Sequence, residues 1–141
     1  MSKTRVLFVC IHNSARSQMA MALLNTYYGN QFEAESAGYE PGTLNPLAID
    51  GMKEIGIDIS NNPTNRVFDY FKQGKLYKYV ITVCDEVNAE RCPIFPGVNQ
   101  MIHWSFSDPS TFDGTYEKKL QKTIEVRDKV KSQIDEWVHT L

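Results

Sequence analysis

Short apolar runs alternate along this chain with segments in which apolar residues recur at helical spacing. The runs at residues 5–10 (RVLFVC) and 79–83 (YVITV) are rich in β-branched residues and predict strands, and shorter strands are predicted at Glu33–Ala37 and Met101–Trp104. Because residues 79–83 are apolar almost without a break, that strand is expected in the middle of a sheet, covered on both faces.

Four helical segments lie between and after these strands. The pattern predicts helices at Ser17–Tyr28, from Asn45-Pro46 to Gly56, at Thr64–Gly74, and from Tyr116 onward. Asparagine is a preferred N-cap residue, proline suits the first helical turn, and glycine suits the end of a helix. The apolar residues expected to face the core are Ile49, Met52 and Ile55 in the second helix, Val67, Phe68 and Phe71 in the third, and Leu120, Ile124, Val130, Ile134 and Trp137 in the last.

Strands that alternate with helices indicate an α/β protein with a parallel, doubly wound sheet. The chain has 141 residues, no internal repeat and no linker-like stretch, so we expect one domain spanning residues 1–141. Hydrophobic residues make up 42% and charged residues 23%, which is typical of a packed globular protein.

Charge and cysteine content narrow the possible partners and the compartment. Fifteen basic and seventeen acidic residues give a net charge of −2, so no overall positive field favours nucleic acid or an anionic membrane. The first apolar run, Val6 to Cys10, is too short for a signal peptide or a membrane span. Three cysteines without a secretory signal suggest a reducing, cytoplasmic compartment.

Two of the cysteines follow predicted strands. Cys10 closes the first strand and Cys84 comes directly after the run at residues 79–83. In parallel sheets, ligands bind beyond the carboxyl ends of the strands, so both thiols are expected at the ligand-binding edge. The alternative is that both are buried as inert small hydrophobic residues.

The segment between the first strand and the first helix has the composition of an anion-binding loop, and we call residues 10–17 the anion loop. It consists of Cys10, Ile11, His12, Asn13, Ser14, Ala15, Arg16 and Ser17. Successive backbone N–H groups and the helix N-terminus would bind an oxyanion, and Arg16 could grip two of its oxygens. The same field favours a Cys10 thiolate, a strong nucleophile, and residues 1–32 contain no Asp or Glu to weaken it.

Some loop side chains have simpler roles. We expect His12 to contribute only its backbone and Asn13 to stabilise a left-handed turn. Ser17 either caps the helix or donates a hydrogen bond to the Cys10 sulfur. A C-x5-R string also arises by chance, so its weight comes from the flanking strand and helix.

A wider set of segments carries a family resemblance. The chain resembles the thioredoxin-coupled arsenate reductases built on the low-molecular-weight tyrosine phosphatase fold, over about residues 4–138. The matching segments are VLFVCIHNSARSQMA, SAG at residues 36–38, NPLAIDGMKEIGIDIS, VITVCD, RCPIFPG and HWSFSDPS. The resemblance implies a four-stranded parallel sheet with helices on both faces and the anion loop at the end of the first strand.

The resemblance also implies a mechanism and its partners. Cys10 would attack arsenate, with Asp108 as the acid; Cys84 would then attack Cys10 and release arsenite, and Cys92 would attack Cys84. Thioredoxin would reduce the final disulfide, and phosphate and sulfate should compete with arsenate. No cofactor is implied. From local sequence alone, Asp108 before Pro109 would be a turn-forming residue.

Between the second and third cysteines, Asp85–Arg91 is polar and lacks Gly and Pro, which is compatible with a short helix. Such a helix would hold the Cα atoms of Cys84 and Cys92 about 12 Å apart. A disulfide requires about 7 Å or less, so oxidation would have to unwind the segment.

Other interpretations remain open at this point. A low-molecular-weight phosphatase would need no second thiol, and such phosphatases usually carry tyrosines after Asp-Pro, where this chain has Ser110 and Thr111. A non-catalytic oxyanion-binding or thiol redox-sensing module would need no Asp108. Zinc is disfavoured because Cys84 and Cys92 are spaced too widely. Some relatives bind potassium near the loop through a glutamate and an aspartate; Met21 and Asn65 stand at those positions, while Asn13 and Ser36 remain, so no metal is expected.

Overall fold

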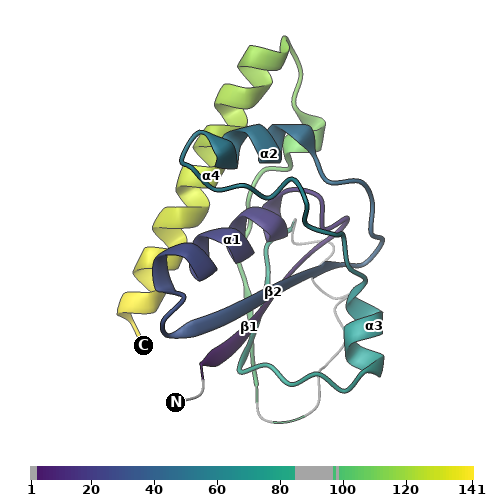
Figure 1. Cartoon of the computed structure of the whole chain (residues 1–141), viewed down its shortest axis with the longest axis vertical. Helices are drawn as coiled ribbons and strands as arrows, with labels where there is room; N and C mark the ends of the chain where they lie inside the picture. The colour runs from purple at the N-terminus through teal and green to yellow at the C-terminus, as the bar shows by residue number, and fades with distance from the viewer. Residues whose placement is uncertain (1–2, 85–96, 98) are drawn as a thin grey trace.

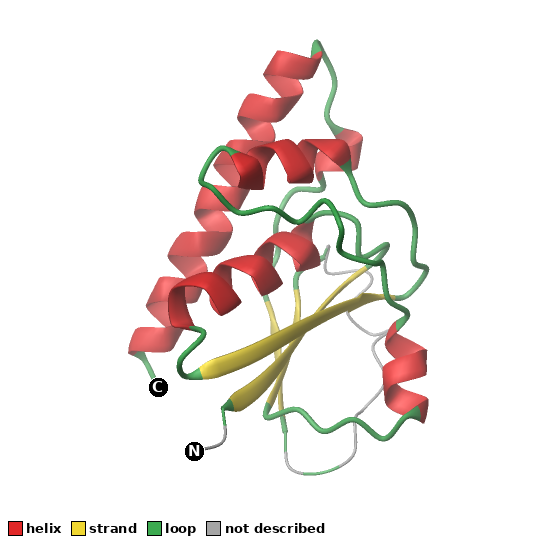
Figure 2. Ribbon diagram, in the orientation of Figure 1, coloured by secondary structure: helices red, strands yellow, loops and turns green. Residues whose placement is uncertain are grey.

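Helices and strands alternate along the chain, as the pattern predicts (Figures 1 and 2). The computed structural model describes residues 3–84, 97 and 99–141. The strands are β1 (Thr4–Cys10), β2 (Phe32–Gly38), β3 (Tyr79–Thr82) and β4 (Gln100–His103), and the helices are α1 (Arg16–Tyr28), α2 (Pro46–Lys53), α3 (Val67–Lys72) and α4 (Tyr116–His139), with a 3₁₀ turn at Pro109–Thr111.

The four strands form one parallel sheet in the order β2-β1-β3-β4. The two central strands are the most apolar, and Val6 to Val9 of β1 are completely buried. Helices α1 and α4 lie side by side on one side of the sheet and α3 lies on the other (Figure 1). The predicted α/β class, the parallel sheet and the helices on both faces are therefore confirmed.

The second helix has the ends that its sequence predicts. The Asn45 side chain accepts a hydrogen bond from the N–H of Leu47, and Pro46 occupies the first helical position. At the other end Gly56 has a φ of +80° and donates to Lys53 O, while Ile57 donates to Met52 O. This pair of bonds is the Schellman arrangement that glycine stabilises.

The predicted third helix is partly wrong. Helix α3 is shorter than Thr64–Gly74, and only Val67 is buried within it. Phe68 and Phe71 were expected to face inward but are 37% and 39% exposed. The face that packs on the core carries Val67 and Tyr70, three residues apart, so Phe68 and Phe71 lie on a neighbouring face of the helix.

Strand β4 begins one residue earlier than predicted and is an exposed edge strand, with Met101 43% exposed. Its pairing nevertheless continues past its end, because Trp104 donates its N–H to Thr82 O. In α4, Val130, Ile134 and Trp137 are buried as predicted. Leu120 and Ile124 are only partly buried.

Two expectations fall outside the described residues: the helix at Asp85–Arg91 and the position of Cys92. Among the helices that the structure describes, none combines the length and the apolar character needed to cross a membrane.

Candidate active site

The sulfur of Cys10 lies at the C-terminal end of β1, where it is buried and receives hydrogen bonds from the anion loop. Cys10 is 2% exposed. The backbone N–H of Asn13 donates to its Sγ at 3.2 Å, and the Ser17 Oγ lies 2.8 Å from the same atom. These two contacts hold the sulfur in place at the base of the anion loop.

The hydroxyl of Ser17 is itself oriented by Asn13. The N–H of Asn65 donates to Asn13 Oδ1 at 2.8 Å, and Asn13 Nδ2 donates to Ser17 Oγ at 2.8 Å. Because Ser17 Oγ already accepts this bond, its own hydrogen is available to donate to Cys10 Sγ. Ser17 is therefore a donor to the sulfur, the more specific of its two predicted roles.

Asn13 adopts the left-handed backbone that its residue type predicts. With a φ of +55°, it has the only positive φ of a non-glycine residue in the described part of the chain. Asparagine tolerates this conformation better than most residues. The turn directs the Asn13 N–H at the Cys10 sulfur.

The carbonyl groups of the anion loop are held by backbone donors from the segment after β2. Every peptide bond that the structure describes is trans, so each loop N–H points away from the carbonyl that precedes it. The carbonyls fixed in this way, with their donors, are Cys10 O to Tyr39 N (3.2 Å), Ile11 O to Glu40 N (2.8 Å), His12 O to Gly42 N (3.0 Å) and Ser14 O to Asn45 N (2.9 Å). Holding these carbonyls on the outer side turns the following N–H groups toward the other side, where the Asn13 N–H meets the sulfur.

The loop backbone also packs directly on Gly38, the last residue of β2. A Cβ at this position would lie 2.7 Å from Asn13 N and 2.8 Å from Ile11 O. Glycine is therefore required here by the close approach of another backbone segment.

We expect Gly38→Ala to displace the anion loop. The variant should lose about 1–3 kcal/mol of unfolding free energy, because main-chain atoms have to move to admit a methyl group. It should also bind inorganic phosphate more weakly than the parent protein. Urea unfolding and phosphate titration measure the two effects.

Gly51→Ala is the matched control. Its Cβ would meet only Thr123 Cγ2, at 3.7 Å, which is an ordinary contact in a helix. If Gly38→Ala were as stable as Gly51→Ala and bound phosphate equally well, the close packing of the anion loop on Gly38 would be contradicted.

The N-terminus of α1 and the Arg16 side chain supply positive charge at the loop. Within the described structure, no side chain caps α1 and its first turn contains no acidic residue. The Arg16 side chain is 3% exposed; its Nη1 donates to Phe106 O at 3.1 Å and its Nη2 lies 3.4 Å from Asp108 Oδ2. The helix N-terminus and the guanidinium are both groups that attract an oxyanion.

Asp108 starts a turn and also lies beside the anion loop. Its Oδ1 accepts the N–H of Ser110 and starts the 3₁₀ turn at Pro109–Thr111, which is the expected turn-forming role. Its Oδ2 faces Arg16, so the same carboxyl group stands beside the anion loop. The structure thus brings Asp108 to Arg16 across 92 residues of sequence, by the numbering of the chain.

Strand β3 ends at Thr82, one residue earlier than predicted, and Cys84 lies two residues after it and is completely buried. The N–H of Val83 donates to Val9 O at 2.8 Å, so the ends of β1 and β3 lie side by side, as the parallel sheet predicts. Cys10, at the end of β1, and Cys84, just after the end of β3, therefore lie at the same edge of the sheet. Cys92 lies outside the described residues.

Sequence reasoning missed the groups that orient the loop. Four of these groups are backbone N–H groups, which almost every residue type has, so the sequence does not reveal them. They belong to Tyr39, Glu40, Gly42 and Asn45. Phe106 contributes its carbonyl oxygen. The prediction that His12 contributes only its backbone is wrong, because its ring Nδ1 lies 2.9 Å from Glu40 O. Gln18 was assigned to the first helix and given no further role, although it follows Ser17 directly and is a polar residue in an otherwise apolar segment.

The side chains next to Asn13 do not fit the potassium site of some relatives. Asn13 Oδ1 already accepts the N–H of Asn65 at 2.8 Å and has the Gln18 amide nitrogen 3.2 Å away. Asn65 directs its side-chain Nδ2 at Ser36 O, and Met21 offers a thioether in place of a carboxylate. Among residues 3–84, 97 and 99–141, no cluster of three His, Cys, Asp or Glu side chains suits a metal ion.

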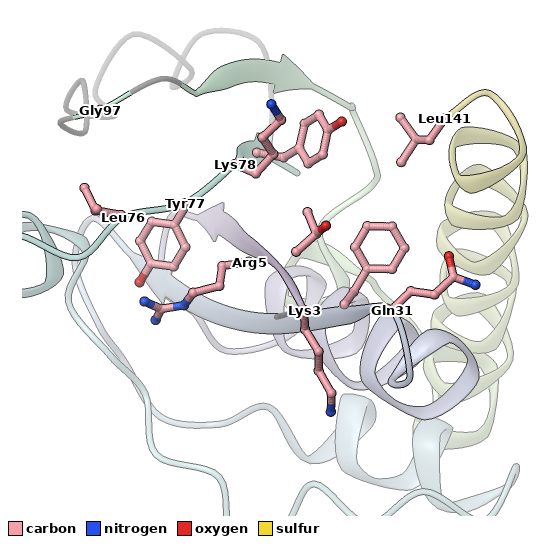
Figure 3. Close-up of a pocket in the computed structure, with 11 residues that line it drawn as sticks. Lys3, Arg5, Gln31, Leu76, Tyr77, Lys78, Gly97 and Leu141 are labelled. Atoms are coloured by element: carbon pink, nitrogen blue, oxygen red, sulfur yellow. The ribbon is translucent and has the colours of Figure 1, made fainter. Parts of the chain in front are cut away.

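A cavity of about 600 Å³ lies at the opposite end of the sheet, lined by the first residues of β1 and by Leu76 to Tyr79 (Figure 3). Its cationic side chains do not converge: Lys3 and Lys78 point in different directions, and Arg5 is paired with Glu35. Burial alone would raise the pKa of Glu35, but hydrogen bonds from Lys75 and Arg5 outweigh it and hold that pKa below its usual range. Arg5 and Lys75 are already paired with Glu35, and the remaining cationic side chains diverge, so the anion loop remains the candidate site.

The fold and the anion loop define the class of protein. The chain belongs to the low molecular weight phosphotyrosine protein phosphatase family, whose family model matches residues 5–141. Several relatives that are similar to this chain over nearly its whole length are arsenate reductases.

One such relative is the arsenate reductase of Bacillus subtilis, which is 38% identical over 136 residues, covering 96% of this chain and 95% of the relative. A solved structure described as an arsenate reductase in the phosphate binding state superposes with a TM-score of 0.76 at 27% identity, over 97% of this chain and 98% of the other. The thioredoxin-dependent arsenate reductase of Corynebacterium glutamicum gives a TM-score of 0.66 at 28% identity, over 99% of this chain and 64% of the other. At this level of similarity the chain is a member of the arsenate reductases within the family.

Proposed function

We propose that this protein reduces arsenate to arsenite through Cys10, Cys84 and Cys92, with thioredoxin as the reductant. The observation that carries the proposal is the buried Cys10 sulfur, which accepts an N–H and lies 2.8 Å from the Ser17 hydroxyl. Its strand pairs with β3, which ends at Thr82, two residues before Cys84. An anion site with one nucleophilic thiol can hydrolyse esters, but a reduction needs a second thiol nearby.

In the first step, the anion loop binds arsenate through the N–H groups of residues 11–17 and the Arg16 guanidinium. Cys10 attacks arsenic, an S–As bond forms, and one oxygen leaves as water after accepting a proton. Asp108, beside Arg16, is the group proposed to give that proton. The product is a covalent adduct between Cys10 and arsenate.

In the second step, Cys84 attacks the sulfur of Cys10. A disulfide forms as the S–As bond breaks, and the bonding pair stays on arsenic, which leaves as arsenite. Arsenic gains two electrons, and the two thiols lose them. The adjacent ends of β1 and β3 support this step, because they place the two cysteines at the same edge of the sheet.

The third step regenerates Cys10. Cys92 attacks Cys84, which frees the Cys10 thiolate and leaves a Cys84–Cys92 disulfide. Thioredoxin then reduces this disulfide by thiol exchange. We expect residues 85–91 to change conformation in this step. We also expect the protein to act in the cytoplasm, a reducing compartment.

A coupled assay tests the proposal. Reduced protein, arsenate, thioredoxin, thioredoxin reductase and NADPH are combined, and NADPH loss is followed beside a parallel aryl-phosphate hydrolysis. Arsenate-dependent NADPH oxidation, inhibited by phosphate and sulfate, is the expected result. Rapid aryl-phosphate hydrolysis without NADPH oxidation would instead favour a phosphatase. Thiol oxidation that is unaffected by loss of Asp108 would favour a redox sensor.

A further inference from the structure

We propose that Gln18 is a positioning residue for the oxyanion site, acting through the peptide bond between Asn13 and Ser14. Gln18 lies in the first turn of α1 and is completely buried. This inference rests on the proposed function, in which the anion loop binds arsenate.

The side chain of Gln18 joins the anion loop to the segment before α3. Its Nε2 lies 3.1 Å from Asn13 O, 3.2 Å from Asn13 Oδ1 and 2.9 Å from Pro63 O. Its Oε1 accepts a bond from Asn62 Nδ2 at 3.2 Å. Carbonyl oxygens can only accept, so the amide group of Gln18 has a single orientation that satisfies Asn13 O and Pro63 O.

Among the described residues, Gln18 holds the one carbonyl of residues 10–14 that accepts no backbone N–H. The carbonyls of residues 10, 11, 12 and 14 are held by the N–H groups of residues 39, 40, 42 and 45. The carbonyl of Asn13 is held instead by the Gln18 side chain. The other four contacts join main-chain atoms. The contact to Asn13 O is therefore the one that replacement of a side chain can remove.

The orientation of the Asn13 carbonyl determines the direction of the next N–H. In a trans peptide the C=O and the following N–H point in opposite directions, so the Ser14 N–H faces away from Gln18. The preceding peptide shows the effect of such a constraint: His12 O is held by Gly42, and the Asn13 N–H is directed at Cys10 Sγ. We infer that Gln18 does the same for the Ser14 N–H, turning it toward the anion.

Asn13 is also the loop residue most in need of support. Its φ of +55° is disfavoured for residues with a side chain. Gln18 contacts both its backbone carbonyl and its Oδ1, and thereby supports the left-handed turn. Loss of Gln18 would let the peptide rotate and would weaken anion binding before it affected the thiol chemistry.

The test replaces Gln18 with leucine and measures phosphate affinity directly. Inorganic phosphate is titrated against the rate of Cys10 alkylation by iodoacetamide, with the Cys10 peptide followed by mass spectrometry. Gln18→Leu should weaken phosphate protection about tenfold or more, because a lost donor to the anion is worth about that factor. In the coupled assay the KM for arsenate should rise by a similar factor, with a smaller change in kcat.

Gln18→Glu provides a second variant with a different signature. A protonated glutamic acid can still donate one hydrogen bond to Asn13 O, whereas a carboxylate would repel it. Phosphate affinity relative to the parent protein should therefore be closest to normal near pH 6 and should fall as the pH rises. A role confined to packing would give a glutamate variant with no such pH dependence.

Two controls separate positioning from stability. Asn62→Ala removes the donor to Gln18 Oε1 and should leave phosphate affinity near that of the parent protein. Asn25 lies in the same helix and makes two hydrogen bonds to the backbone of Ala34. Its Oδ1 accepts from Ala34 N at 2.8 Å, and its Nδ2 donates to Ala34 O at 3.0 Å. Asn25→Ala should lower the unfolding free energy without changing phosphate affinity.

The outcomes distinguish the two proposals. If the parent protein binds phosphate and both Gln18 variants bind it equally well at every pH, the role of Gln18 is overturned and the proposed function stands. If phosphate protects Cys10 in a Gln18-dependent way but arsenate is not reduced, the positioning role stands and the reductase proposal fails. If Gln18→Leu does not fold, the pH dependence of phosphate affinity in Gln18→Glu decides whether Gln18 has the positioning role.

Discussion

Replacing Cys10 with serine is expected to abolish arsenate reduction, with activity in the coupled assay falling to background. Cys10 Sγ is the atom at which the Asn13 N–H and the Ser17 hydroxyl converge. A serine oxygen in this position would remain protonated at neutral pH and would be a far weaker nucleophile. The fold should survive, because the substitution changes one buried atom without changing the shape of the side chain.

Cys92→Ser is the matched variant, because the proposed order places arsenite release before Cys92 acts. A single turnover should release one equivalent of arsenite, and mass spectrometry should find Cys10 joined to Cys84. Absence of arsenite from this variant, in a preparation whose Cys10 reacts normally, would contradict the proposed order.

Replacing Arg16 with lysine should lower kcat/KM for arsenate by roughly two orders of magnitude or more. The charge is kept, but the planar fork is lost, and with it the ability to bind two oxygens of the anion at once. The buried guanidinium also contacts Phe106 O and Asp108, and a lysine ammonium cannot reproduce both contacts together with an anion. Steady-state kinetics and phosphate titration measure the loss.

Lys131→Arg makes the reverse exchange on the surface of α4, where Lys131 pairs with Asp135 four residues away. It should leave kcat/KM unchanged. Normal kinetics in Arg16→Lys would mean that Arg16 serves the structure and does not bind the substrate.

The features that the sequence predicted well are those determined by local pattern. The apolar run ending at Cys10 became β1, the Asn45-Pro46 and Gly56 signals bounded the region of α2, and parallel pairing placed Cys10 and Cys84 at one edge. The left-handed backbone of Asn13 followed from its residue type. Each of these inferences needed only neighbouring residues or the direction of the strands.

The features that the sequence did not predict depend on contacts between distant segments. Phe68 and Phe71 have the apolar character of core residues, but α3 is short and packs through Val67 and Tyr70. The backbone donors at residues 39–45 leave no signal in residue type, because any residue except proline has an N–H. Gln18 could have been suspected only as a polar residue in an apolar helical segment, and its partners are set by the tertiary fold.

An oxyanion site built mainly from backbone N–H groups has a consequence for how its sequence can vary. Four of the five carbonyls from Cys10 to Ser14 are held by other main-chain atoms, so the side chains of Ile11 and Ser14 have no part in those bonds. The His12 ring lies 2.9 Å from Glu40 O and helps to hold the segment that supplies these donors. A saturation library at Ile11 and Ser14 should retain a large fraction of active clones. The same library at Asn13 and Gln18, whose side chains shape the turn, should retain few. Mutational tolerance along the loop would then follow the division between main-chain and side-chain contacts, and distance from the sulfur would be a poor guide to it.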